Sequence, residues 1–158
     1  MPIYERELMG KLAREMGDTD TSNLYYSSNQ LFSAINDGLS DFNDDVPNQQ
    51  YSVTGTGDDA YFSPNPGIED QRLITLFAAI ALTRGEIQKS TRTAIVHSNA
   101  AGKTDLSKIP SLLHDQVDRL QDKVDKLLMK RSQVLVEEEL DEAGVELTGS
   151  VETEVEGT

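Results

Sequence analysis

Three groups of residues in this 158-residue chain have types and spacings that could do chemistry. The first is Gly102-Lys103-Thr104, which follows a short β-type run and precedes a helical pattern. A phosphate-binding loop ends in this way, because its backbone amides cradle phosphates and its lysine neutralises them. Such a loop also needs a glycine five residues before Gly102, where this chain has His97. We therefore interpret the segment as a loop and do not expect nucleotide binding.

The second and third groups are an acidic run and the two histidines. The run begins at Asp18 and resembles the start of a calcium-binding loop, but its sixth position is Asn23 instead of glycine and its twelfth is Asn29 instead of glutamate. Neither His97 nor His114 has a carboxylate or second histidine at the spacing of a metal site or a catalytic relay. A G-x-S-x-G serine motif is absent from the sequence. We expect no catalytic residue, no cofactor and no metal.

Charge is distributed unevenly along the chain. The formal net charge is −14, and residues 133–158 contribute nine acidic side chains without one Lys or Arg. The first 132 residues hold 19 acidic and 14 basic side chains, so they are only mildly acidic. Without a basic cluster the chain lacks the electrostatic footprint of a protein that grips nucleic acid. An acidic protein surface past which DNA slides is a different case. There, repulsion between the like charges of protein and DNA would be useful.

Covalent cross-links and membrane spans are not expected. The sequence contains no cysteine, so the fold must be held by burial or by association, as suits a reducing cytoplasm. The longest nearly unbroken apolar run, Leu73 to Leu82, is too short to cross a bilayer. The N-terminal residues lack the apolar region of a secretion signal. We expect a soluble, unsecreted protein without membrane association.

The elements that would position these side chains are four helices and one β-hairpin. The first helix repeats apolar residues at Tyr4, Leu8 and Leu12 and ends at Gly17. A Ser-capped helix, a hairpin, a helix that is apolar almost all round and a helix with an apolar stripe follow, over Ser28 to Pro47, Tyr51 to Phe62, Ile68 to Gln88 and Leu106 to Arg131. The alanines of the third helix would allow close helix approach. A separate short β-type run is predicted at Thr93 to Val96.

The predicted core comes from the apolar faces of the last three helices. The stripe of the fourth helix is expected to pack mainly inside its own domain, and pairing between chains is the alternative. The core residues are Leu31, Ile35, Leu39, Leu73, Leu76, Phe77, Ile80, Leu113, Val117, Leu120, Val124 and Leu127. The fold class is therefore mainly α, a compact bundle of about four helices with a small β-hairpin and an extended acidic C-terminal arm. We divide the chain into an N-terminal helix and linker (1–23), a helical domain (24–132) and the arm (133–158).

The acidic arm is too highly charged to fold alone, yet it carries regularly placed apolar residues. Like charges repel, and too little apolar surface is present to offset the entropy lost on ordering. Period-two alternation from Val151 to Glu156 allows strand addition to an exposed sheet edge. We expect the arm to order on a partner outside this chain. The expected anchors are Val134, Leu135, Val136 and Leu140, with Val145, Leu147, Val151 and Val155 as secondary contacts.

The order of these elements, rather than any short motif, resembles the head-tail connector or head-completion adaptor proteins of tailed bacteriophages. The matching pieces are the four segments from Ser28 to Arg131 given above. The first helix and the acidic arm are not part of the pattern. The resemblance implies a virion protein that forms a ring, commonly of twelve copies, beneath the portal. That ring extends the DNA channel towards a downstream tail or stopper protein, and it joins the capsid to the tail without gripping DNA. The partner of the acidic arm would then be the portal or a neighbouring subunit.

Two other hypotheses remain open from the sequence. In one, the chain is a soluble helical interaction module or regulator, whose acidic tail mimics nucleic acid or occupies the basic cleft of a partner. In the other, it is an enzyme of nucleotide chemistry, a hypothesis that depends on Gly102-Lys103-Thr104 alone.

Overall fold

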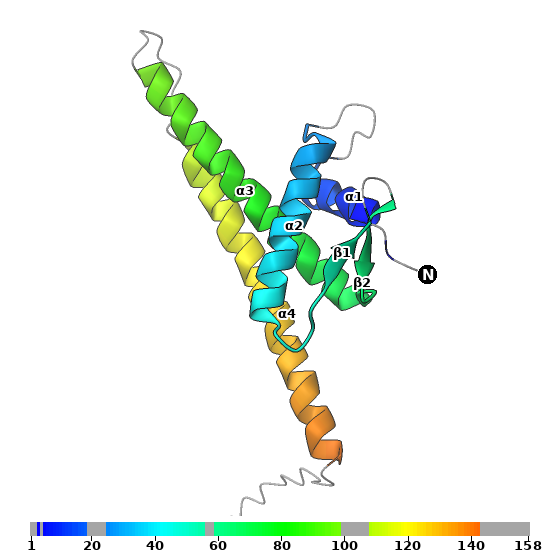
Figure 1. The fold of residues 1–158 in the computed structure, drawn as a ribbon. Helices are drawn as coiled ribbons and strands as arrows, with labels where there is room; N and C mark the ends of the chain where they lie inside the picture. The colour runs from blue at the N-terminus through cyan, green and yellow to red at the C-terminus, as the bar shows by residue number, and fades with distance from the viewer. Residues whose placement is uncertain (1–2, 4, 19–24, 56–58, 99–107, 143–158) are drawn as a thin grey trace, which may run out of the picture. The chain divides into compact units, whose positions relative to one another are not determined.

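Four helices and one antiparallel pair of strands make up the described part of the chain. The computed structural model describes residues 3, 5–18, 25–55, 59–98 and 108–142 (Figure 1). The elements in order are α1 (Glu5–Glu15), α2 (Ser28–Asp45), β1 (Ser52–Thr54), β2 (Tyr61–Ser63), α3 (Ile68–Ser98) and α4 (Lys108–Glu142). The predicted fold class, mainly helical with a small hairpin, is confirmed.

Helix α1 packs by the apolar face that the sequence predicts. Leu8 and Leu12 are fully buried, and Glu5 lies on the same face, three residues before Leu8. The helix is followed by Gly17, whose φ of +77° lies in the left-handed region that glycine adopts without a steric penalty. The amide of Gly17 donates to the carbonyl oxygen of Arg14 and so satisfies part of the helix end.

Helix α2 begins at a capping box. The Ser27 hydroxyl oxygen accepts a hydrogen bond from the amide of Gln30 at 3.3 Å, and Oε1 of Gln30 accepts one from the amide of Ser27 at 2.9 Å. Two amides that the helix itself cannot satisfy are thereby paired. The buried face of α2 consists of Leu31, Ala34, Ile35, Gly38, Leu39 and Phe42.

Helices α2 and α3 approach closely at Gly38. A Cβ atom added to Gly38 would lie 2.4 Å from the backbone nitrogen of Ala78 and 2.9 Å from its Cβ. Only a glycine opposite a small residue allows this approach, so the expectation that alanines of the third helix permit close packing is confirmed here. The surrounding part of α3 is buried nearly all round, at Leu73, Ile74, Leu76, Phe77, Ala78, Ala79, Ile80 and Leu82.

The hairpin is held by α2 and by the N-terminal segment. Val53 of β1 lies opposite Phe62 of β2 in the antiparallel register. The side-chain amide of Asn43 donates to the carbonyl oxygen of Tyr51 at 2.8 Å and accepts from its amide at 2.9 Å. The amide of Phe62 donates to the carbonyl oxygen of Ile3 at 3.1 Å. These contacts supply the support that two short strands alone would lack.

Helix α3 extends beyond its predicted end at Gln88. The backbone stays helical through Ser98, so the separate β-type run predicted at Thr93 to Val96 is wrong. β-branched residues reduce helix propensity only slightly, and extending a formed helix costs far less than starting one. Thr91 shows how such a residue fits, because its hydroxyl donates to the carbonyl oxygen of Ile87 at 2.8 Å.

Helix α4 also extends beyond its predicted end, Arg131. It continues to Glu142, so residues 133–142 of the predicted arm are helical, and residues 143–158 lie outside the described residues. Glutamate is a good helix former, and the run Glu137-Glu138-Glu139 therefore continues the helix despite its charge.

The apolar stripe of α4 is only partly covered. Leu120 and Val124 are buried, as predicted. Leu113, Val117 and Leu127 are half-buried instead of belonging to the closed core. The stripe is therefore covered less completely at these three positions than at Leu120 and Val124.

The chain divides into two compact units, Met1–Asp125 and Lys126–Thr158. The sequence placed its divisions after residues 23 and 132 instead. In the structure α1 belongs to the first unit, in which Leu8 and Leu12 are part of the core. None of the helices in the described ranges is long and apolar enough to cross a membrane.

Candidate interaction surfaces

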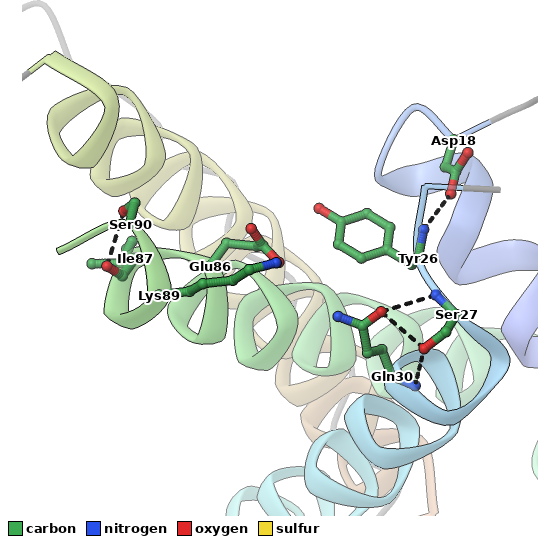
Figure 2. Close-up of polar contacts among 8 residues, drawn as sticks. All are labelled: Asp18, Tyr26, Ser27, Gln30, Glu86, Ile87, Lys89 and Ser90. Atoms are coloured by element: carbon green, nitrogen blue, oxygen red, sulfur yellow. Dashed lines mark hydrogen bonds and ion pairs between the residues drawn. The ribbon is translucent and has the colours of Figure 1, made fainter. Parts of the chain in front are cut away.

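The side chains that the sequence singled out for possible chemistry lie apart or outside the described residues. In the described part of the chain, no group of three or more His, Asp or Glu side chains could hold a metal ion. Asp18 accepts a hydrogen bond from the amide of Tyr26 at 3.1 Å, which joins the end of α1 to the start of α2 (Figure 2). His114 is exposed on α4. The structure does not describe the side chain of His97, nor does it describe residues 19–24 and 102–104.

Glu5 is a charged residue that is buried almost completely. Its side chain is 1% exposed, and Oε1 accepts a hydrogen bond from Nδ2 of Asn36 at 3.1 Å. Oε2 has no hydrogen-bond partner among the described residues. Burial raises the pKa of Glu5 to about 7, while the Asn36 hydrogen bond acts in the opposite direction. Since the amide of Glu5 also donates to the carbonyl oxygen of Ala60 at 3.0 Å, this acid lies where α1, α2 and the hairpin meet.

A groove with basic walls lies between α1, α3 and the first part of α4. We call it the basic groove. Its volume is about 220 Å³, and it is lined by Lys11, Glu15, Ile68, Arg72, Thr75, Leu76 and Lys123. Three of these side chains are cationic and one is anionic, so the groove is positively charged within a chain whose net charge is −14. Such a surface would attract an acidic group from a partner.

The polar contacts of the basic groove hold its walls in place. Nζ of Lys11 donates to Oε1 of Gln71 at 2.6 Å. Lys123 of α4 forms an ion pair with Glu15 of α1. Buried Leu76 forms part of the apolar lining, whereas the side chain of Ile68 is 84% exposed. The groove therefore combines apolar contact area with cationic groups.

A second groove lies between α2 and α3 and has the opposite character. We call it the α2–α3 groove. Its volume is about 260 Å³, and its charged lining consists of Asp37, Glu86 and Lys89. Figure 2 shows Lys89 beside Glu86, with Nζ 3.8 Å from Oε1. Burial raises the pKa of the nearby Tyr26 to about 12, and the negative charge of Glu86 adds to this shift. This groove does not favour an acidic partner.

Helix α4 presents apolar side chains along its length. Leu112 is 65% exposed and Met129 is 68% exposed. Residues three, four or seven positions apart share one side of a helix, so Ile109 and Leu112 lie on one side of α4 in the first unit, and Met129 and Val136 lie on one side in the second. The exposed set is Ile109, Leu112, Met129, Val134 and Val136.

The predicted partner anchors fall into three groups in the structure. Val134 and Val136 are exposed on α4, as a contact surface requires. Leu135 and Leu140 lie in the same helix, but their side chains are outside the description. The four secondary anchors, Val145, Leu147, Val151 and Val155, lie wholly outside the described residues.

Sequence reasoning missed both Glu5 and the basic groove. A signal for Glu5 was present, because its spacing of three and seven residues from Leu8 and Leu12 places it on the buried face of α1. No local sequence pattern indicated the basic groove, since only tertiary packing brings together Lys11, Arg72 and Lys123.

Comparisons with models of protein families, with curated proteins and with solved structures find no match to this chain.

Proposed function

We propose that the chain is a non-enzymatic virion protein, a head-tail connector that forms a ring under the portal and joins the capsid to the tail. In this proposal the ring, of twelve copies as is common among the proteins that the chain resembles, extends the DNA channel. The end of α4 binds the portal, and the opposite side of the ring meets a downstream tail or stopper protein. The protein is made in the host cytoplasm and resides in the neck of the virion.

The observation that supports this proposal most is the incompletely covered apolar stripe of α4. Leu113 and Val117 are half-buried in the single chain, and Leu112 is exposed beside them. Covering a large aliphatic side chain contributes roughly 1.5–3 kcal/mol, so neighbouring copies would gain stability by packing on this stripe. In the second unit, Val134 and Val136 are exposed on two different sides of α4 near its end, where the portal would bind.

The charge of the chain supports a channel that DNA passes without being held. The net charge is −14, and the basic side chains of the basic groove are too few for a continuous phosphate-binding track. Repulsion between an acidic wall and DNA keeps the duplex free to move.

A pull-down with the portal protein encoded by the same genome tests the α4 contact. The full-length double variant Val134→Asp/Val136→Asp places two charges in the proposed contact and should lose portal binding. Ser132→Asp/Gln133→Asp adds the same charge to exposed neighbouring positions of the same helix and should retain it. Equal binding by both variants would contradict the assignment of the α4 end to the portal.

The alternative function, a soluble interaction module with an acidic tail, predicts a different result. Such a protein would remain monomeric in light scattering, would bind a basic protein and would show no affinity for a portal. That combination would favour the alternative over the connector.

A further inference from the structure

The basic groove has the chemistry of a site for an acidic, valine-rich peptide. Its apolar lining is provided by Leu76 and by Ile68, whose side chain is 84% exposed. Lys11, Arg72 and Lys123 add three cationic groups. Long basic side chains can place their charges at a rim while their methylene stems lie along apolar surface. A peptide with apolar residues on one side and carboxylates on the other would satisfy both parts of the groove.

The C-terminal residues of this same chain have that composition. Residues 144–158 contain four glutamates, no basic residue, and apolar side chains at Val145, Leu147, Val151 and Val155. Alternation with period two from Val151 to Glu156 would place valines and glutamates on opposite sides of an extended peptide. The valines would then face the apolar lining, and the glutamates would meet the cations at the rim.

Charge complementarity distinguishes the basic groove from the other surfaces that could bind the C-terminal segment. The hairpin offers strand edges, but the exposed Asp59 lies two residues before β2 and would repel glutamates. The α2–α3 groove is lined by two carboxylates and one lysine. The basic groove has the opposite excess of charge, with three cations and one carboxylate.

We propose that the C-terminal segment of one copy docks in the basic groove of a second copy, with Val155 against the exposed Ile68 and the glutamates near Lys11, Arg72 and Lys123. This inference rests on the proposed ring. The groove and the segment are different surfaces, so the contact between copies is heterologous, and heterologous contacts generate closed rings when the rotation permits. The helical residues of α4 that precede the segment remain free to bind the portal.

Disulfide trapping tests the contact in the full-length chain. Because the protein has no cysteine, introduced cysteines report single positions. The double variant Ile68→Cys/Val155→Cys carries one thiol in the groove and one in the segment, and the exposure of Ile68 makes the first change compatible with folding. Diamide oxidises two adjacent thiols to a disulfide. The matched control is Lys89→Cys/Val155→Cys, which moves the first thiol to the α2–α3 groove.

The expected product is a ladder of dimers and higher multimers on a non-reducing gel. The ladder should form at least about tenfold faster than in the control, because docking raises the effective concentration of the paired thiols. Adding Arg72→Glu, or raising the salt concentration, should slow it, because both weaken attraction between the groove and the glutamates. A rate equal to the control, or a disulfide confined within one chain, would overturn the proposal.

The result of the disulfide experiment can be distinguished from a failure of the connector proposal. Portal-bound rings without a ladder would refute docking in the groove and leave the connector standing. A ladder from a protein that never binds a portal would support docking and contradict the connector.

Discussion

The carboxylate of Glu5 accepts a hydrogen bond from Nδ2 of Asn36 at 3.1 Å and thereby joins the first turn of α1 to the middle of α2. This contact satisfies Oε1, whereas Oε2 is buried with no partner in the described part of the chain. A buried carboxylate with an unsatisfied oxygen is costly when ionised and much less costly when protonated. Glu5 therefore links the packing of α1 to pH.

We expect the stability of the fold to depend on pH through Glu5. Its pKa is raised from 4.5 to about 7 in the folded chain, so the folded state binds a proton over a range in which the unfolded state has lost it. The stability that protonated Glu5 contributes to the fold is thus fully present below pH 4.5 and is lost as the pH rises through about 7. Over that range the free energy of unfolding should fall by roughly 3 kcal/mol relative to a chain without this acid.

Urea denaturation of the wild type and of Glu5→Gln at pH 5 and pH 8 measures this effect. The variant keeps an oxygen that can accept from Asn36 and cannot ionise, so its stability relative to the wild type should be greater at pH 8 than at pH 5. Burial also raises the pKa of Asp41, and comparison with the Glu5 variant removes that shared contribution. Parallel pH profiles for the two proteins would contradict the role of Glu5.

The close approach of α2 and α3 at Gly38 predicts an unusually harmful glycine-to-alanine change. In Gly38→Ala the new methyl group would lie 2.4 Å from the backbone nitrogen of Ala78, and backbone atoms cannot rotate away as a flexible side chain can. We expect a loss of roughly 1–3 kcal/mol, typical of overpacking. The control Gly10→Ala, on a helix surface with nothing within 4 Å, should gain up to about 1 kcal/mol from helix propensity. Equal thermal stability of the two variants would argue against this helix packing.

The capping box of α2 predicts a difference between two adjacent serines. Ser27→Ala removes the hydroxyl that accepts from the Gln30 amide, and it should cost about 1 kcal/mol of stability. Ser28→Ala changes an exposed residue inside the helix and should be neutral or slightly stabilising, because alanine is the better helix former. Chemical denaturation of both variants checks this expectation, and a larger loss from Ser28→Ala would place the helix start elsewhere.

The sequence was sufficient to predict the elements whose signals are local. A Ser-capped helix was predicted from Ser28, and α2 begins there in the structure with Ser27 as its cap. Gly17 marks the end of α1 because its positive φ suits glycine. The apolar stretch around Ala78 had to be buried, since apolar residues occupy almost every side of the helix from Leu73 to Leu82.

The ends of α3 and α4 were predicted less accurately than the other elements. Residues with opposing preferences for secondary structure lie there. At Thr93 to Val96 the β-branched residues favour a strand, yet the helix that precedes them continues. At Glu137 to Glu139 the charge favours disorder, yet glutamate itself favours a helix. Composition averaged over residues 133–158 concealed this second preference.

The candidate surfaces depend on tertiary contacts that sequence patterns do not contain. Lys11, Arg72 and Lys123 come from three helices and meet only after folding. The predicted anchors Val134 and Val136 were found by a local rule, apolar residues within an acidic segment, and they are exposed on α4.

The proposed ring on a portal is tested most directly by electron microscopy of the full-length protein mixed with the portal encoded by the same genome. We expect class averages in which a second ring is stacked coaxially on the portal and continues its channel. Portal particles without added density, from a mixture in which this chain stays monomeric, would contradict this proposal.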